Sequence, residues 1–169
     1  MNSEQEYYIS LVDRLRQLPD ETEWVEYKVN NSEPELIGEY ISALSNSATI
    51  CNKEKAYLLW GINDKTHEIE GTTFAPKKAK KGNEEIENWL AGGLKPRVDF
   101  KFIEVSTDKG NVVVMEIPAA VNTPTSFRGT EFIREMDNGN FEITNMGALL
   151  LAKDLNAFAH LKKKSGSCH

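Results

Sequence analysis

The chain has 169 residues, 40% hydrophobic and 27% charged, which predicts one ordinary domain, or one domain plus a short appendage, and excludes global disorder. Its formal net charge of -6 argues against a protein that simply coats nucleic acid. No run approaches the roughly 20 apolar residues that span a bilayer. The acidic, polar start does not resemble a signal peptide. We therefore expect a cytoplasmic protein with no membrane partner.

Three segments carry apolar residues at helical spacing. These predicted helices are residues 4–18, residues 32–49 and, after a cap at Asn83, the segment with Ile86, Trp89, Leu90 and Leu94. Ser32 and Glu35 form a capping box for the second helix, whose apolar stripe should pack on a sheet. Asn46, near the end of that helix, is expected either at the polar surface or facing the acids described below. Trp60 and Trp89 lie in apolar patterns and are expected in the core.

Strands are predicted at residues 24–29, 56–62, 67–71, 98–102, 112–117, 125–127, 131–134 and 141–143. Residues 56–62 are nearly all apolar, which is typical of a central strand covered on both faces. Turn signals join several of the other strands into hairpins. This order of elements predicts an α+β fold in which a mixed, largely antiparallel sheet packs with three main helices. We place the domain at residues 1–136 and a short C-terminal appendage and tail, with a helix at 146–155, at residues 137–169.

Residues 21–28 concentrate acids, aromatic residues and a lysine in one short segment. Strand alternation places Val25 and Tyr27 on one face, so Glu26 and Lys28 are expected together on the opposite, solvated face. Glu21 precedes this strand. Two acids beside a lysine can bind a divalent cation and contact a phosphate. The alternative is an ordinary solvated polar strand face, which is the commoner arrangement.

Basic residues gather in a segment that ends in glycine and is expected to be exposed. It contains Lys77, Lys78, Lys80 and Lys81, and Arg97, Arg128 and Arg134 follow further along the chain. Such a segment is either a solvated loop or a surface that tracks a nucleic-acid backbone. In the second case Lys28, Arg97 and Arg134 extend the binding surface.

The chain resembles the Schlafen AlbA_2 domain in the ordered segments E-T-E-W-V-E-Y-K, I-G-E-Y-I-S-A-L-S-N-S-A and A-Y-L-L-W-G-I-N-D-K-T-H-E-I-E-G-T. The resemblance extends over residues 19–135. This domain occurs in bacterial proteins assigned as DNA-binding regulators and in animal Schlafen proteins. Residues 140–155 resemble a segment that normally lies well downstream in the bacterial relatives, so the chain is expected to be shortened at the C-terminus.

The resemblance also implies a set of candidate catalytic residues. Some Schlafen proteins are metal-dependent endoribonucleases that act on transfer and ribosomal RNA through three acids, which correspond here to Glu21, Glu26 and Asp64. These residues are the expected catalytic groups and the expected ligands of Mg²⁺ or Mn²⁺. The alternative for Asp64 is ordinary turn chemistry after Asn63.

Three functional hypotheses follow. The leading one is a nucleic-acid-binding domain, for RNA or DNA, related to transcriptional regulators. The second is a metal-dependent endoribonuclease acting on structured RNA such as transfer RNA. The third is an oligomerisation or partner-binding remnant with no nucleic-acid role. Because Schlafen nuclease cores pair two such lobes around a valley, we also expect a homodimer.

Overall fold

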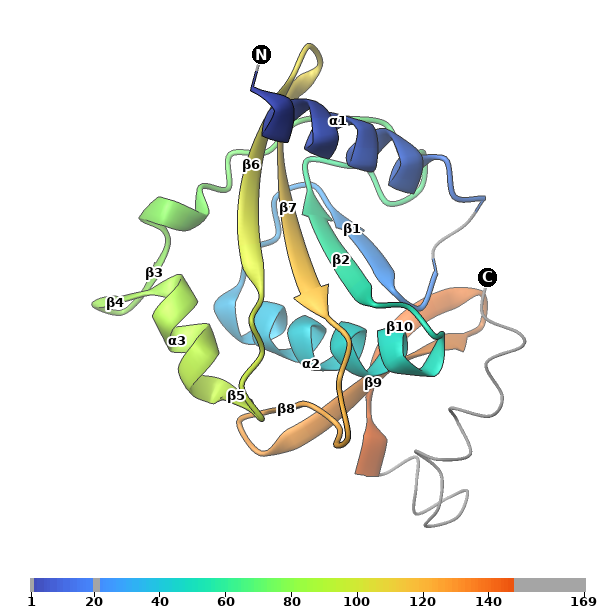
Figure 1. Cartoon of the computed structure of the whole chain (residues 1–169), viewed down its shortest axis with the longest axis vertical. Helices are drawn as coiled ribbons and strands as arrows, with labels where there is room; N and C mark the ends of the chain where they lie inside the picture. The colour runs from blue at the N-terminus through green and yellow to red at the C-terminus, as the bar shows by residue number, and fades with distance from the viewer. Residues whose placement is uncertain (1, 20–21, 148–169) are drawn as a thin grey trace.

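The computed structural model describes residues 2–19 and 22–147, which form three α-helices and two four-stranded sheets (Figure 1). The helices are α1 (Ser3–Arg16), α2 (Pro34–Ile50) and α3 (Ile86–Gly93). They confirm the predicted helices, with ends shifted by a few residues. The predicted α+β class, with a mixed and largely antiparallel sheet arrangement, is also confirmed.

The first sheet contains β1 (Val25–Lys28), β2 (Lys55–Trp60), β7 (Gly110–Pro118) and β6 (Lys101–Thr107), in that order. The β1 and β2 strands are parallel, and the other neighbours are antiparallel. As its apolar sequence predicts, β2 is an inner strand. The expected strand at residues 67–71 is reduced to one bridge between Ile62 and Ile69.

The second sheet is entirely antiparallel. It contains β10 (Asn140–Asn145), β9 (Thr130–Asp137), β8 (Ser126–Phe127) and β5 (Leu94–Lys95). A separate two-stranded ribbon pairs β3 (Lys80–Lys81) with β4 (Glu84–Glu85), just after a 3-10 turn, η1 (Pro76–Lys78). The β9–β10 hairpin runs across the expected domain boundary at residue 136. The expected helix at 146–155 and the tail lie largely outside the described residues, so the boundary stays a prediction.

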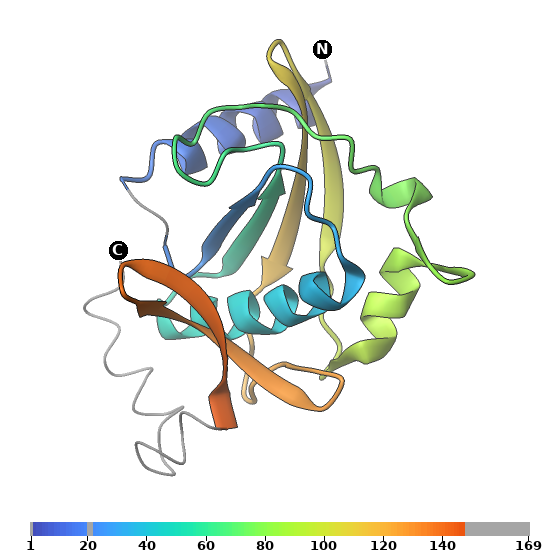
Figure 2. The same cartoon turned by 180° about the vertical axis from the view of Figure 1, so that it is seen from behind.

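Helix α2 lies between the two sheets, and α1 covers the other face of the first sheet (Figures 1 and 2). One stripe of α2 is apolar and packs on the first sheet through Ile37, Ile41, Leu44 and Ala48. The expected capping box at Ser32 is not formed. Glu33 is the N-cap residue and makes no side-chain cap bond, whereas Pro34 opens the helix as its sequence position favours.

The opposite stripe of α2 is polar but equally buried, and it holds the second sheet by side-chain hydrogen bonds. The Asn46 amide nitrogen donates to the carbonyl oxygens of Thr125 (2.9 Å) and Phe132 (2.8 Å), and its oxygen accepts from the Thr125 amide (2.7 Å). The Ser42 hydroxyl donates to the same Thr125 carbonyl at 2.7 Å. Both expectations for Asn46 are therefore wrong, because its side chain is buried against the backbone of the second layer.

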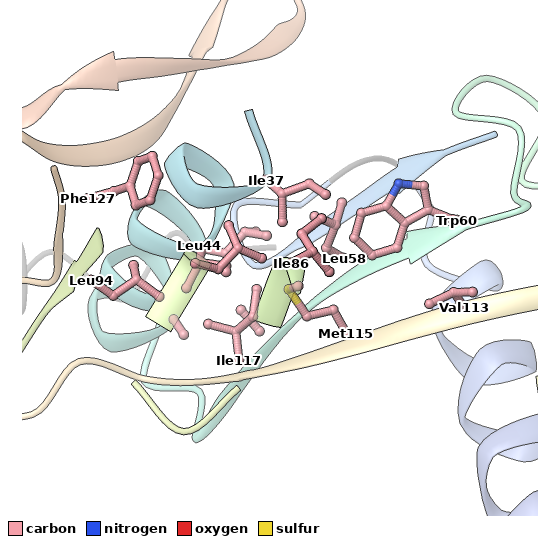
Figure 3. Packing of buried hydrophobic residues seen from close by; sticks show 14 residues of the cluster. Ile37, Leu44, Leu58, Trp60, Ile86, Leu94, Val113, Met115, Ile117 and Phe127 are labelled. Atoms are coloured by element: carbon pink, nitrogen blue, oxygen red, sulfur yellow. The ribbon is translucent and has the colours of Figure 1, made fainter. Parts of the chain in front are cut away.

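The main core fills the space between the first sheet, α2 and α3, and includes Trp60, Met115 and Ile86 (Figure 3). Phe127 enters this core because two glycines leave room for its ring. A Cβ atom on Gly38 would lie 2.3 Å from the ring, and one on Gly93 would lie 2.5 Å from it. Among the helices in residues 2–19 and 22–147, none has the length and apolar character needed to cross a membrane.

Candidate nucleic-acid interface

Glu26 lies on β1 and is only 3% exposed. The Arg134 Nη2 atom donates to Glu26 Oε2 at 2.6 Å, and Lys28 Nζ lies 2.7 Å from Oε1. The expectation that Glu26 faces solvent is therefore wrong. Strand alternation does place Glu26 opposite Val25 and Tyr27, but α2 and β9 cover that face as well.

Arg134 lies on β9, and its side chain is fully buried. Its Nη1 atom donates to the carbonyl oxygens of Val25, at 2.7 Å, and of Thr22, and its guanidinium lies over the Phe141 ring at 4.9 Å. One guanidinium thus fixes the turn before β1, the Glu26 carboxylate and the β9–β10 hairpin. The expectation that Arg134 extends an exposed basic surface is wrong, because these partners enclose it.

Lys28 keeps a partly exposed side chain, at 23%, beside the Tyr40 ring. Burial lowers the pKa of Lys28, but the negative charge of Glu26 and its hydrogen bond to Lys28 act in the opposite direction. The net result is a pKa raised above 10.5. Burial, followed by the negative charge of Glu26, raises the pKa of Tyr40. Lys28 is therefore a charged partner of Glu26.

Asp64 occupies an exposed position in the turn after β2. The turn itself is held by Asn63, whose side-chain oxygen accepts from the amides of Lys65 (2.9 Å) and Thr66 (3.0 Å). Asp64 lines a cavity of about 690 Å³ with Arg16, His67, Asn140 and Phe141 among its other walls. Since Phe141 also stacks on Arg134, the β9–β10 hairpin links the surroundings of Asp64 to those of Glu26.

The expected metal site was tested on these positions. Glu21 lies outside the described residues. Within residues 2–19 and 22–147, no three His, Cys, Asp or Glu side chains are grouped closely enough to hold a metal ion. Each carboxylate oxygen of Glu26 already has a cationic partner. The described residues alone therefore supply no complete set of ligands, and the ligand role of Glu21, Glu26 and Asp64 stays a prediction from which we derive no chemical step.

The lysine segment, which we define as Lys77, Lys78, Lys80 and Lys81, projects at the edge of the molecule on η1 and β3 (Figure 1). Three of its members are exposed, and no carboxylate in the described ranges forms an ion pair with Lys77, Lys78 or Lys80. Lys81 differs, since its Nζ lies 2.6 Å from Glu35, whose pKa it lowers to about 2. The segment thus presents three lysines that form no ion pair with the described residues, while Lys81 joins the ribbon to the start of α2.

Beside this segment, the Trp89 ring on α3 lies next to two cations, one from β3 and one from the β8–β9 turn. Lys81 Nζ and Arg128 Cζ each lie 5.8 Å from the centroid of its ring. The expectation that Trp60 is a core residue is confirmed by its complete burial. Trp89 only partly follows that expectation, because it packs on the core but also lines a cavity of about 410 Å³ with Lys95 and Arg128.

The sequence shows Arg128 as a basic residue but predicts neither its neighbours nor a role for Lys95. No local signal marks this pairing, because Trp89 and Arg128 meet only when the β8–β9 turn folds against the end of α3. Arg97 is 88% exposed, as expected, and pairs with the 75% exposed Asp99 at 2.8 Å. Exposed pairs of this kind contribute little to stability.

A family model described as "Schlafen, AlbA_2" matches residues 21–140 of the chain. No curated protein matches it. Two solved structures are similar to it: the DIP2311 protein from Corynebacterium diphtheriae (15% identity, TM-score 0.45) and the N-terminal domain of an ATP-dependent DNA helicase RecG-related protein from Nitrosomonas europaea (21% identity, TM-score 0.42). The matches cover 85% and 72% of this chain, and 27% and 76% of those chains, so this chain spans about a quarter of the Corynebacterium protein.

Proposed function

This chain belongs to the Schlafen AlbA_2 family, and on that premise we propose that it is a nucleic-acid-binding domain related to bacterial DNA-binding transcriptional regulators. The observation that carries this proposal is the set of three exposed lysines, Lys77, Lys78 and Lys80, that have no carboxylate partner within the described residues.

Binding must be local, because the whole chain carries a net charge of -6 and repels a polyanion at long range. An ammonium group that is already paired gains little from a phosphate, since it must first release its carboxylate. Lys77, Lys78 and Lys80 need no such release. When they neutralise phosphates, counterions leave the nucleic acid, which drives association.

The test compares two triple variants with the same change in net charge. The first is Lys77→Gln, Lys78→Gln and Lys80→Gln; the control replaces the exposed Lys53, Lys65 and Lys109 in the same way. Binding of fluorescent duplex DNA and of an RNA hairpin is measured by anisotropy at low salt. We expect the first variant to bind roughly tenfold more weakly and the control to stay within about twofold of the parent. Equal weakening by both would contradict the proposal, because overall charge alone would then govern binding.

The second candidate is a metal-dependent endoribonuclease acting on structured RNA such as transfer RNA. It is favoured by the exposed Asp64 at a cavity of about 690 Å³ and by the family correspondence of Glu21, Glu26 and Asp64. The two cations on Glu26 count against it. Asp64→Asn should leave the fold intact, because Asp64 is exposed and Asn63 makes the turn bonds. Transfer-RNA cleavage with Mg²⁺ or Mn²⁺ that disappears in this variant favours the nuclease, whereas no cleavage by the parent rejects it.

We also propose a homodimer, because one copy supplies only one lobe of the two-lobed valley that Schlafen nuclease cores use. Light scattering over a range of concentrations tests this proposal directly. A dimer at high concentration is expected, and a monomer throughout would overturn the proposal.

A further inference from the structure

We propose that the cavity beside Trp89 binds one unpaired nucleobase of a nucleic-acid strand, so that this domain prefers single-stranded segments or overhangs to blunt duplex. The proposal rests on the proposed function and adds the class of substrate. At this cavity an accessible aromatic ring and cations line a hollow of suitable size.

The cavity of about 410 Å³ lies between the end of α3, the short strand β5 and the β8–β9 turn. Trp89 and Phe127 are its aromatic walls, with ring centroids 5.7 Å apart in an edge-on arrangement. Phe127 is only 4% exposed and forms the floor, while Trp89 keeps part of its ring accessible. Lys95 and Arg128 stand at the rim, and both side chains are exposed.

These groups match the two halves of a nucleotide. Every nucleobase has a flat π-face that stacks on an indole ring, and the adjoining phosphate needs a cation. The Arg128 guanidinium lies 5.8 Å from the Trp89 centroid, where it can stack on a base or bind its phosphate. The recognition is indifferent to base identity, because stacking does not read hydrogen-bonding edges.

The walls of the cavity are held together before any ligand arrives. The Arg128 amide donates to the Gly93 carbonyl at 2.8 Å, which ties the β8–β9 turn to the end of α3. The Leu94–Phe127 and Lys95–Ser126 pairs of the β5–β8 ladder fix the opposite side. Phe127 is seated against Gly38 and Gly93, as described above. Little ordering is therefore required on binding, which favours affinity.

The cavity also adjoins the lysine segment. Lys81 lies over the same Trp89 ring and follows Lys80 directly on β3. A strand whose phosphates contact the exposed lysines can therefore place its next base over Trp89. Inside a blunt duplex each base is stacked on both faces, so only the two end pairs offer a face to the indole ring.

Filling the cavity tests the proposal without removing a charge. A Cβ atom on Gly92 would meet nothing within 4 Å, and Gly92 has ordinary helical backbone, so Gly92→Met projects a side chain into the cavity without strain. The matched control is Ala91→Met, at the neighbouring exposed position of α3 that does not line the cavity. Gly92→Met should keep or raise the melting temperature, because methionine is a much better helix former than glycine, and Ala91→Met should lower it only slightly, because alanine is a slightly better helix former than methionine.

Affinity is measured for a blunt duplex and for the same duplex with a single-stranded overhang. We expect the parent to bind the overhang probe more tightly than the blunt probe. In Gly92→Met the affinity for the overhang probe should fall roughly tenfold and the preference should disappear, whereas Ala91→Met should retain it. Trp89→Leu, which keeps an apolar contact with the core, should weaken overhang binding between about fivefold and about a hundredfold, the range for one lost stacking partner. Unchanged overhang binding in Gly92→Met would overturn this inference but leave the proposed function standing. A parent that binds neither probe would overturn the proposed function as well.

Discussion

Two groups of cations in this molecule behave in opposite ways. Lys28 and Arg134 hold the buried carboxylate of Glu26 at 2.7 and 2.6 Å, whereas Lys77, Lys78 and Lys80 stand exposed with no carboxylate partner among the described residues. The first group is compensated, so its charge stabilises the fold. The second forms no ion pair with the described residues, so its charge is available to a partner. A charged side chain stabilises the fold or remains available to a partner according to the residues that surround it, not according to its type.

The buried arrangement occurs twice in the first sheet. Glu116 on β7 is 3% exposed and lies between Lys55 at 3.0 Å and Lys101 at 3.3 Å. It points to the α1 face, where Lys101 also lies over the Tyr8 ring, while Glu26 points to the α2 face. Each face of the sheet therefore carries one buried acid paired with two cations, although both lysines of Glu116 contact the same oxygen and are 45% and 56% exposed.

Breaking the buried network should have the largest effect. Arg134→Met removes one partner of Glu26 and the donors to the Thr22 and Val25 carbonyls, so we expect a loss of about 3–5 kcal/mol in the free energy of unfolding. Urea denaturation followed by circular dichroism measures it. The double variant with Glu26→Gln should lose less than the sum of the single losses, since it no longer buries an unpaired carboxylate. A loss below about 1 kcal/mol for Arg134→Met would contradict this account.

Asn46→Ala tests the uncharged counterpart of that network. The substitution leaves the Thr125 amide and the Phe132 carbonyl without their partner, while the Thr125 carbonyl keeps Ser42, so we expect a loss of about 3 kcal/mol. Asn31→Ala is the control, because the Asn31 side chain is exposed and accepts only one long hydrogen bond, at 3.4 Å. The same denaturation experiment should show a difference of under about 0.5 kcal/mol for the control.

Alkaline pH should weaken the fold more gradually. Burial, followed by the negative charge of Glu116, raises the pKa of Tyr57 from 10.0 to about 12. A group with a raised pKa in the folded state stabilises fully below its unfolded pKa, and this contribution is lost as pH rises through the folded pKa. The free energy of unfolding should therefore fall between pH 10 and 12. Lys28, whose pKa is also raised, adds to the fall, and Tyr57→Phe should make it shallower. An identical slope in Tyr57→Phe would remove Tyr57 from the explanation.

The smallest effect is expected for Arg97→Ala. Arg97 and Arg134 are the same residue type, and both pair with a carboxylate within 2.8 Å, but Arg97 is 88% exposed. Solvent screens its pair with Asp99, so the loss should be under about 0.5 kcal/mol. If Arg97→Ala and Arg134→Met proved equally destabilising in parallel melts, burial would not be the feature that separates the two groups of cations.

Much of the fold could be predicted from local patterns. The main errors concern side chains that are buried by segments far away in the sequence. Helical periodicity predicted α1 and α2 within a few residues, and the turn at residues 108–111 predicted the β6–β7 hairpin. The turn at 137–140 and the strand after it were also predicted, but their pairing with β9 was not. Alternation on β1 showed which residues share a face with Glu26. It carried no information on β9, which comes far later in the chain and covers that face.

The same limit applies to the candidate sites. The lysine segment was predictable because its members are adjacent in sequence, although the pairing of Lys81 with Glu35 was not. The sequence places Asn46 either at the polar surface or facing the acids, because its actual partners are backbone groups, which leave no trace in the side-chain pattern. The Trp89 cavity depends on a turn supplied by another part of the chain and was missed for that reason.

The central claim, that the exposed lysines bind the nucleic-acid backbone while the buried cations do not, is tested most directly by salt dependence. The slope of log affinity against log salt concentration is measured for the parent and for the variant with Lys77, Lys78 and Lys80 replaced by glutamine. Each lost phosphate contact removes about 0.9 from the slope on duplex DNA, so the account predicts a slope shallower by about 3. A slope equal to that of the parent would contradict it.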